Sequence, residues 1–272
     1  MDFVILANAW QDGLQNPTSK HHVARELARA GHRVLWLNGA GMRTPSLGVG
    51  HDRSRIAAKI GQAMSGIQPG GDRIWVVAPL ILPFPQSGLA RRFNARVYQR
   101  AARRACRRLG FSEPTFINFL PMVPQFQDRW PWRKLYYCVD RWDAFDTYDA
   151  DLMTRLDELC CRSADLVVTT SAALQERARR YNGNTHLVLH GVNHAHFASS
   201  LNGFERPEDL PNQGRIFGFI GLLGAWVDQE LLIQLARKHP EDQVVLIGGA
   251  DVDVSALDAE TNIHVLGPRP FA

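Results

Sequence analysis

The chain has 272 residues, of which 45% are hydrophobic and 21% are charged, and its formal net charge is +4. This composition is typical of a globular protein and excludes disordered and fibrous chains. No apolar run approaches the roughly 20 residues that span a bilayer, and the N-terminus lacks a basic signal-peptide start. We therefore expect a cytoplasmic protein.

Strand-like and helical patterns alternate through the first part of the chain. Short apolar runs, typical of strands buried on both faces of a parallel sheet, are Phe3–Ala7, Arg33–Leu37, Arg73–Val77, Thr115–Phe119, Leu135–Val139, Asp165–Thr169 and His186–Leu189. Helical periodicity predicts helices over Ser19–Ala30, Arg53–Met64, Gly88–Leu109, Asp151–Cys161 and Ala172–Tyr181. This order predicts a complete α/β domain over residues 1–197, with a doubly wound, Rossmann-like parallel sheet.

The predicted helix over Gly88–Leu109 is basic and amphipathic. Its apolar stripe consists of Phe93, Val97, Ala101, Ala105 and Leu109, with Tyr98, Ala102 and Cys106 beside it. Another face carries Arg96, Arg100, Arg103 and Arg107. These arginines either are simply solvated or hold the protein at the inner face of an anionic membrane. We expect no nucleic-acid binding, because no recognised nucleic-acid module accompanies the patch.

A turn-rich, apolar-poor stretch over residues 198–214 predicts an interdomain linker. The alternation then restarts in a second domain over residues 215–272. Its predicted elements are the strands Arg215–Ile220, Gln243–Ile247 and Asn262–Leu266 and the helix Asp228–Lys238. Three strands leave an edge and much of one face uncovered, so we expect this Rossmann-like domain to be incomplete.

The loop Asn8–Thr18 follows the first predicted strand, at the sheet edge where α/β proteins bind ligands. The next helix begins with Lys20 and His21, whose charges would reinforce the positive N-terminus and create an anion site. The alternative is that Thr18 or Ser19 only caps this helix.

Asp140 follows another predicted strand on the same edge and is itself followed by Arg141, Trp142 and Asp143. A carboxylate at this position could orient a hydroxyl group or act as a base. The alternative is a turn or helix-cap aspartate without a chemical role.

Glycine loops follow the predicted strands of the second domain. Gly221–Trp226 lies between a strand and a helix, so its backbone could approach a diphosphate closely. It lacks the Gly-x-Gly-x-x-Gly pattern, which counts against a dinucleotide oxidoreductase. Gly248–Asp251 and Gly267–Phe271 form further loops on the same edge.

Cysteine and histidine spacings do not predict a metal site. Cys106, Cys138, Cys160 and Cys161 lack CxxC spacing, so we expect reduced thiols in the core. His190, His194 and His196 have a zinc-like spacing, but they precede a linker without a nearby cysteine or a helix to align them.

Several segments together resemble bacterial glycosyltransferases of the two-lobed GT-B fold, and most nearly the retaining, nucleotide-sugar-dependent family 4 group. The segments are Trp10, Pro17–His22, Gly31–Trp36, Tyr137–Trp142, Ala164–Ser171, His190–Asn193 with Phe197, and Gly218–Gly221. They cover the chain in the family's order, and no single one would identify it. The resemblance implies an acceptor domain, a hinge and a donor domain.

The resemblance further implies a hexosyltransferase that moves a sugar from a nucleotide-diphosphate sugar to a saccharide or lipid-linked acceptor. The pathway would be surface polysaccharide or glycolipid synthesis, and the reaction would need no metal and no cofactor besides the donor. We assign Asp140 and His21 to catalysis. Donor contacts are assigned to Lys20, Gly221, Gly224, Gly249 and Arg269, with Arg269 near the base.

The donor domain departs from the family pattern. The family's pair of glutamates eight residues apart is absent, and Ala225 and Trp226 stand where a basic residue is usual. We therefore expect a donor domain cut short and little activity.

Two alternatives to a glycosyltransferase remain open. A sugar-nucleotide epimerase of the same fold would need titratable groups from both domains, of which the second offers Asp251 and Asp253. A non-catalytic interaction module would be completed by a partner chain.

Overall fold

The computed structural model describes residues 1–10, 17–39, 66–84, 86–145, 148–203 and 205–270. The chain divides into two compact units, of which the first ends at Gly191 and the second continues from Val192. The sequence placed the end of the first domain at residue 197 and the linker over residues 198–214.

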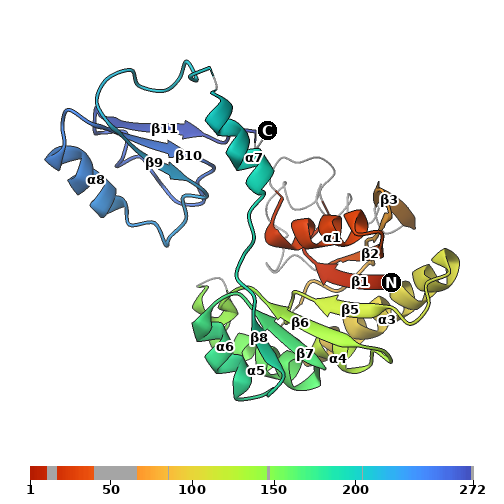
Figure 1. Cartoon of the computed structure of the whole chain (residues 1–272). Helices are drawn as coiled ribbons and strands as arrows, with labels where there is room; N and C mark the ends of the chain where they lie inside the picture. Colours follow the sequence, from red (N-terminus) through yellow and green to blue (C-terminus); the bar gives the residue numbers. More distant parts are fainter. Residues whose placement is uncertain (11–16, 40–65, 85, 146–147, 204, 271–272) are drawn as a thin grey trace. The chain divides into compact units, whose positions relative to one another are not determined.

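Within the described residues, the first unit is built on an eight-stranded sheet of order β3-β4-β2-β1-β5-β6-β7-β8 (Figure 1). The strands are β1 (Asp2–Ala7), β2 (Arg33–Asn38), β3 (Ile67–Gly71), β4 (Ile74–Val77), β5 (Thr115–Asn118), β6 (Lys134–Cys138), β7 (Leu166–Thr169) and β8 (Thr185–Leu187). Among these strands, neighbours pair in parallel except β3 and β4. The α/β, Rossmann-like fold of this unit is as the sequence predicts.

Helices cover both faces of this sheet. They are α1 (Ser19–Arg29), α3 (Gly88–Leu109), α4 (Pro124–Asp128), α5 (Ala150–Ser163) and α6 (Ala172–Arg179), with a 3-10 turn η1 at Trp142–Ala144. Figure 1 shows α1 on one face and α3, α4 and α5 on the other. Successive strand residues point to opposite faces, so in β1 Val4 and Leu6 pack with α3 while Ile5 and Ala7 pack with α1.

One strand and one α-helix of this unit were not predicted, and one predicted helix cannot be compared. β3 reads Ile-Gln-Pro-Gly-Gly, a composition depleted in strands, and it pairs antiparallel with β4 across a turn in which Arg73 has φ 56°. The sheet is therefore not parallel throughout. The short helix α4 is the other addition. The helix predicted over Arg53–Met64 lies outside the described residues.

The helix α3 has the predicted bounds but a different buried face. Ser87 caps its start by accepting a hydrogen bond from the Ala90 N–H, and the left-handed Gly110 ends it. The predicted placement of Phe93 in the apolar stripe is wrong, because Phe93 is 47% exposed whereas Asn94 is buried. Asn94 exchanges two hydrogen bonds with the backbone of Leu82, at 2.8 and 2.9 Å, and this pairing turns the neighbouring Phe93 outward.

The cysteines behave as the sequence predicts. All four are free and buried in the first unit. Burial raises the pKa of the Cys106 thiol to about 12. These side chains therefore serve as small apolar core groups.

The second unit has its own small sheet. Its described strands β9 (Ile216–Ile220), β10 (Gln243–Ile247) and β11 (Ile263–Gly267) are parallel in the order β11-β10-β9. Helix α8 (Gln229–Lys238), capped by Asp228, packs on one face. The short helices α7 (His194–Ala198) and η2 (Ser199–Asn202) precede the sheet and were not predicted. On the opposite face Ile216 and Ile220 are 37% and 82% exposed.

Candidate functional site

The carboxyl ends of β1, β2 and β6 lie at one edge of the larger sheet because these strands are parallel. The start of α1 lies at the same edge, since its first turn follows the loop after β1. Trp10 and Trp36 meet there edge to face, with ring centroids 4.9 Å apart. This is the edge at which the sequence predicts ligand binding.

Lys20 and Asp140, both predicted to be site residues, are brought together at this edge. The Nζ atom of Lys20 lies 4.0 Å from Oδ2 of Asp140, and the two side chains are 6% and 41% exposed. The ammonium group also lies 5.3 Å from the ring centroid of Trp142. Burial lowers the pKa of Lys20, and the Asp140 carboxylate opposes this by favouring the charged form. The pair thus places an accessible carboxylate beside a buried cation.

His21 has a different environment, in which both ring nitrogens contact the chain. Nδ1 accepts the Thr18 backbone N–H at 3.2 Å, so Nε2 carries the proton and donates to the Ala9 carbonyl at 3.4 Å. The Thr18 hydroxyl also contacts Nδ1 at 2.9 Å. This reciprocal arrangement is a capping box for α1. It corresponds to the capping alternative, with Thr18 rather than Ser19 at the N-cap and His21 as its partner.

The ring of His21 is also held by aromatic contacts. It stacks on Trp36 with centroids 5.0 Å apart and an interplanar angle of 23°, and it lies 5.3 Å from Trp10. Burial is the main cause of its lowered pKa, and the neighbouring cations Arg25 and Lys20 add to it. His21 is therefore a neutral residue that positions the first turn of α1 next to Lys20.

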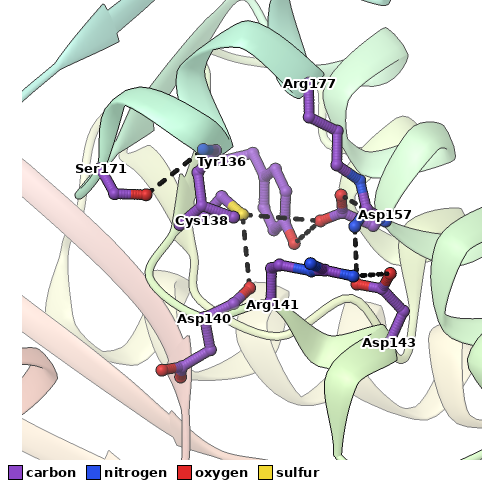
Figure 2. Close-up of polar contacts among 9 residues, drawn as sticks. Tyr136, Cys138, Asp140, Arg141, Asp143, Asp157, Ser171 and Arg177 are labelled. Carbon is purple, nitrogen blue, oxygen red and sulfur yellow. Dashed lines mark hydrogen bonds and ion pairs between the residues drawn. The ribbon is translucent and has the colours of Figure 1, made fainter.

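A partly buried charge network anchors the loop that carries Asp140 (Figure 2). Arg177 of α6 donates to Asp143 at 2.6 Å and lies 3.6 Å from Asp157 of α5. Asp143 also pairs with Arg141 at 3.2 Å. Burial raises the pKa of Asp143, but its hydrogen bonds from Arg177 and Arg141 outweigh burial and leave the pKa below its ordinary value.

Asp157 is the innermost member of this network. Tyr136 donates its hydroxyl hydrogen to Asp157 at 2.5 Å, and both side chains are buried. Burial raises the pKa of Asp157, against the opposing effects of Tyr136 and Arg177. A carboxylate so placed depends on its partners, because an unpaired buried charge is costly.

The backbone at Asp140 is held from both sides. Thr170 donates its hydroxyl hydrogen to the Val139 carbonyl at 3.1 Å, and the Cys138 sulfur lies 3.7 Å from the Asp140 carbonyl oxygen. The loop is thus fixed while the Asp140 side chain stays accessible. Arg177 and Asp157 were not predicted from the sequence. The available signal was an aspartate between Leu156 and Cys160 on the apolar side of the predicted helix.

In the second unit, the glycine loops after β9 and β10 contact each other through their backbones. The Gly221 N–H donates to the Ile247 carbonyl at 2.9 Å, and the Leu223 N–H donates to the Gly249 carbonyl at 2.8 Å. Gly248 has φ 147°, and a Cβ atom there would lie 1.8 Å from the Gly221 carbonyl oxygen. The predicted Gly221 and Gly249 therefore lie together, but the close approach requires glycine at position 248.

The other two predicted donor residues, Gly224 and Arg269, have close neighbours in this structure. The ring of Trp226 lies next to Gly224, so that a Cβ atom added to Gly224 would lie 2.5 Å from it, and Trp226 is itself 64% exposed. Arg269 donates to Asp209 at 2.6 Å. The described part of the chain contains no group of three or more His, Cys, Asp or Glu side chains gathered as for a metal ion.

Comparison with known proteins addresses the fold. No family model and no curated protein matches the chain. Among solved structures, it resembles the trehalose-6-phosphate synthase OtsA, with a TM-score of 0.55, 14% identity and coverage of 99% of this chain and 74% of that one. It also resembles the UDP-forming α,α-trehalose-phosphate synthase from Burkholderia vietnamiensis, with a TM-score of 0.54, 11% identity and coverage of 95% and 66%.

The fold is GT-B. This agrees with the fold expected from the sequence motifs, and each unit supplies a Rossmann-like sheet to it. At these identities the likeness concerns the fold alone. The family 4 assignment and the shortened donor domain go beyond the fold and stay predictions.

Proposed function

We propose that this chain is a glycosyltransferase that moves a hexose from a nucleotide-diphosphate sugar to an acceptor hydroxyl. The observation that carries the proposal is the Lys20–Asp140 pair at the carboxyl edge of the larger sheet, where α/β folds bind ligands. The GT-B fold supports it. So does the name of one similar structure, which describes a UDP-forming synthase, because such a reaction releases the nucleotide from a nucleotide-linked donor.

In the proposed reaction the acceptor oxygen bonds to the anomeric carbon while the bond from that carbon to the diphosphate breaks. Asp140 orients the acceptor hydroxyl and, as the base, accepts its proton when the new bond forms, which its 41% exposed side chain allows. The nucleoside diphosphate leaves with the bonding electrons from the same face that the acceptor enters, so the anomeric configuration is retained. Lys20 stabilises negative charge at this edge, as preorganised cations do.

The donor is proposed to bind at the edge formed by Gly221, Gly224 and Gly249, with Arg269 near the nucleobase. Arg269 would exchange its exposed pairing with Asp209 for the donor nucleotide. Such an exchange loses little, because exposed ion pairs are weak. A saccharide or lipid-linked acceptor in surface polysaccharide or glycolipid synthesis is the proposed partner.

The test combines binding with turnover, since the sequence predicts low turnover. Isothermal titration with UDP and GDP measures the nucleotide site, and release of nucleoside diphosphate from UDP- and GDP-hexoses measures transfer. We expect Asp140→Asn to lower turnover about 100-fold with unchanged thermal stability. Asp128→Asn, which alters an exposed aspartate at the end of α4, is the matched control. Absence of both nucleotide binding and transfer in the unmodified chain would overturn the proposal.

A further inference from the structure

One exposed face of the first unit joins apolar side chains to a row of arginines. On α3 the members of this face recur every three or four residues, which places them along one side of the helix. They are Leu89, Phe93, Arg96, Arg100, Arg103 and Arg107. Leu89 is 78% exposed and Phe93 is 47% exposed, while the four arginines are also exposed.

The segment before α3 also carries exposed apolar side chains. Leu80, Leu82 and Phe84 are 56%, 40% and 52% exposed and alternate with less exposed residues. The two hydrogen bonds between Asn94 and the Leu82 backbone hold this segment against the first turns of α3. Exposed apolar side chains therefore occur both at the start of α3 and in the segment fixed to it.

Within the described residues, no recorded ion pair neutralises the arginines on this face. Helix α3 contains eight arginines and no aspartate or glutamate. Among the ion pairs recorded between described residues, none includes Arg96, Arg100, Arg103 or Arg107. An uncompensated row of positive charge favours an anionic partner.

We propose that this surface docks the protein on an anionic lipid membrane. The α3 surface, as we call it, consists of Leu80, Leu82, Phe84, Leu89, Phe93, Arg96, Arg100, Arg103 and Arg107. The apolar side chains enter the boundary between headgroups and acyl chains, and the arginines contact lipid phosphates. In the part of the chain that the structure describes, no helix has the length and apolarity to cross a bilayer, so α3 lies on the membrane surface.

The exposed apolar residues distinguish this partner from the alternatives. A solvated helix face has no need of an exposed leucine and phenylalanine in line with its arginines, and several exposed apolar groups beside charged ones are typical of an interaction site. A nucleic acid would use the arginines, yet it would leave Leu80, Leu82 and Phe84 in water. The burial of Asn94 gives this face its apolar end, because it turns Phe93 away from the core.

The experiment is co-sedimentation of the full chain with vesicles of phosphatidylcholine alone or mixed with phosphatidylglycerol. We expect binding to the mixed vesicles only. Each arginine near the headgroups contributes about fivefold in affinity, so Arg96→Gln with Arg103→Gln should weaken binding about 25-fold. Leu89→Ser with Phe93→Ser should weaken it at least about tenfold while leaving the charge unchanged. Arg179→Gln with Arg180→Gln on α6 is the charge-matched control and should bind as the unmodified protein does.

A second readout does not depend on weakened binding. In the Phe93→Trp variant, brominated anionic lipid should quench the tryptophan fluorescence more strongly than it does in the unmodified protein. The proposal is overturned if the unmodified chain ignores the mixed vesicles. It is also overturned if the variant Leu89→Ser with Phe93→Ser binds the mixed vesicles at full strength. A third contrary outcome is that a duplex RNA displaces the protein from the vesicles and binds this variant and the unmodified protein equally well. None of these outcomes bears on the proposed sugar transfer, which rests on other residues.

Discussion

The Nζ atom of Lys20 lies 4.0 Å from Oδ2 of Asp140, and the lysine side chain is only 6% exposed while the aspartate side chain is 41% exposed. One residue begins α1 and the other follows β6, so only the parallel sheet brings them to the same edge. Burial of an ammonium group costs free energy unless its partners compensate fully. A half-exposed carboxylate compensates in part, which suggests a chemical role for Lys20.

Replacement of Lys20 by methionine should therefore leave stability intact. We expect the free energy of unfolding in urea to change by less than about 1.5 kcal/mol, because methionine preserves much of the side-chain volume and removes a desolvated charge. Nucleoside diphosphate release should fall at least about tenfold. Lys238→Met, at an exposed lysine of α8, should change neither quantity. A large loss of stability in Lys20→Met would instead assign Lys20 a structural role.

The buried imidazole of His21 predicts a pH dependence of stability. Burial lowers the pKa of His21 below its ordinary 6.5. At pH values between 6.5 and the His21 pKa of the folded protein, the unfolded chain therefore binds a proton that the folded protein does not. Stability is then fully present above pH 6.5 and falls as the pH decreases through this window. Each unit of pKa depression corresponds to about 1.4 kcal/mol.

The comparison for this prediction is His21→Gln, whose amide can still accept the Thr18 N–H in a capping box. Urea unfolding of both proteins from about pH 8 to about pH 5 isolates the His21 contribution. The stability of the unmodified protein should decrease relative to His21→Gln as the pH falls. A difference between the two proteins that is independent of pH would contradict the buried, neutral imidazole.

Arg177 should be essential to the fold around Asp140. Arg177→Ala leaves Asp143 and the buried Asp157 without their common partner, and we expect a loss of roughly 3 kcal/mol in the free energy of unfolding. Arg180→Ala on the same helix removes an exposed pair with Glu176 and should cost less than about 1 kcal/mol. Urea unfolding of the two variants measures this contrast, and equal losses would show that the Arg177 network adds no stability.

Gly248 and Gly249 provide a matched pair in the second unit. Gly248→Ala combines a strained φ of 147° with a Cβ overlap on the Gly221 carbonyl, so we expect a loss of about 2–3 kcal/mol and weaker UDP or GDP binding. A Cβ atom on Gly249 would make only an ordinary 3.7 Å contact with Leu222, and Gly249→Ala should change stability by less than about 1 kcal/mol. Thermal unfolding and titration calorimetry check both variants. Tolerance of alanine at position 248 would mean that the two loops can separate freely.

Local patterns in the sequence determined most of the longer elements of both units. Strands buried on both faces read as continuous apolar runs, so β1 and β10 could be predicted to within a residue. Helical periodicity likewise marked α3, which has its predicted bounds. Asp140 and Lys20 could be proposed together because parallel strands end at a common edge.

Tertiary structure alone decided which side chains meet. Tyr136, Asp157 and Arg177 come from a strand and two helices, and no local pattern encodes their contact. Asn94 reads as a polar surface residue of α3, yet its two hydrogen bonds to Leu82 bury it and expose Phe93. Periodicity reports which residues share a face of an element. The rotation of that element, and the partners of its polar groups, depend on hydrogen bonds to segments distant along the chain.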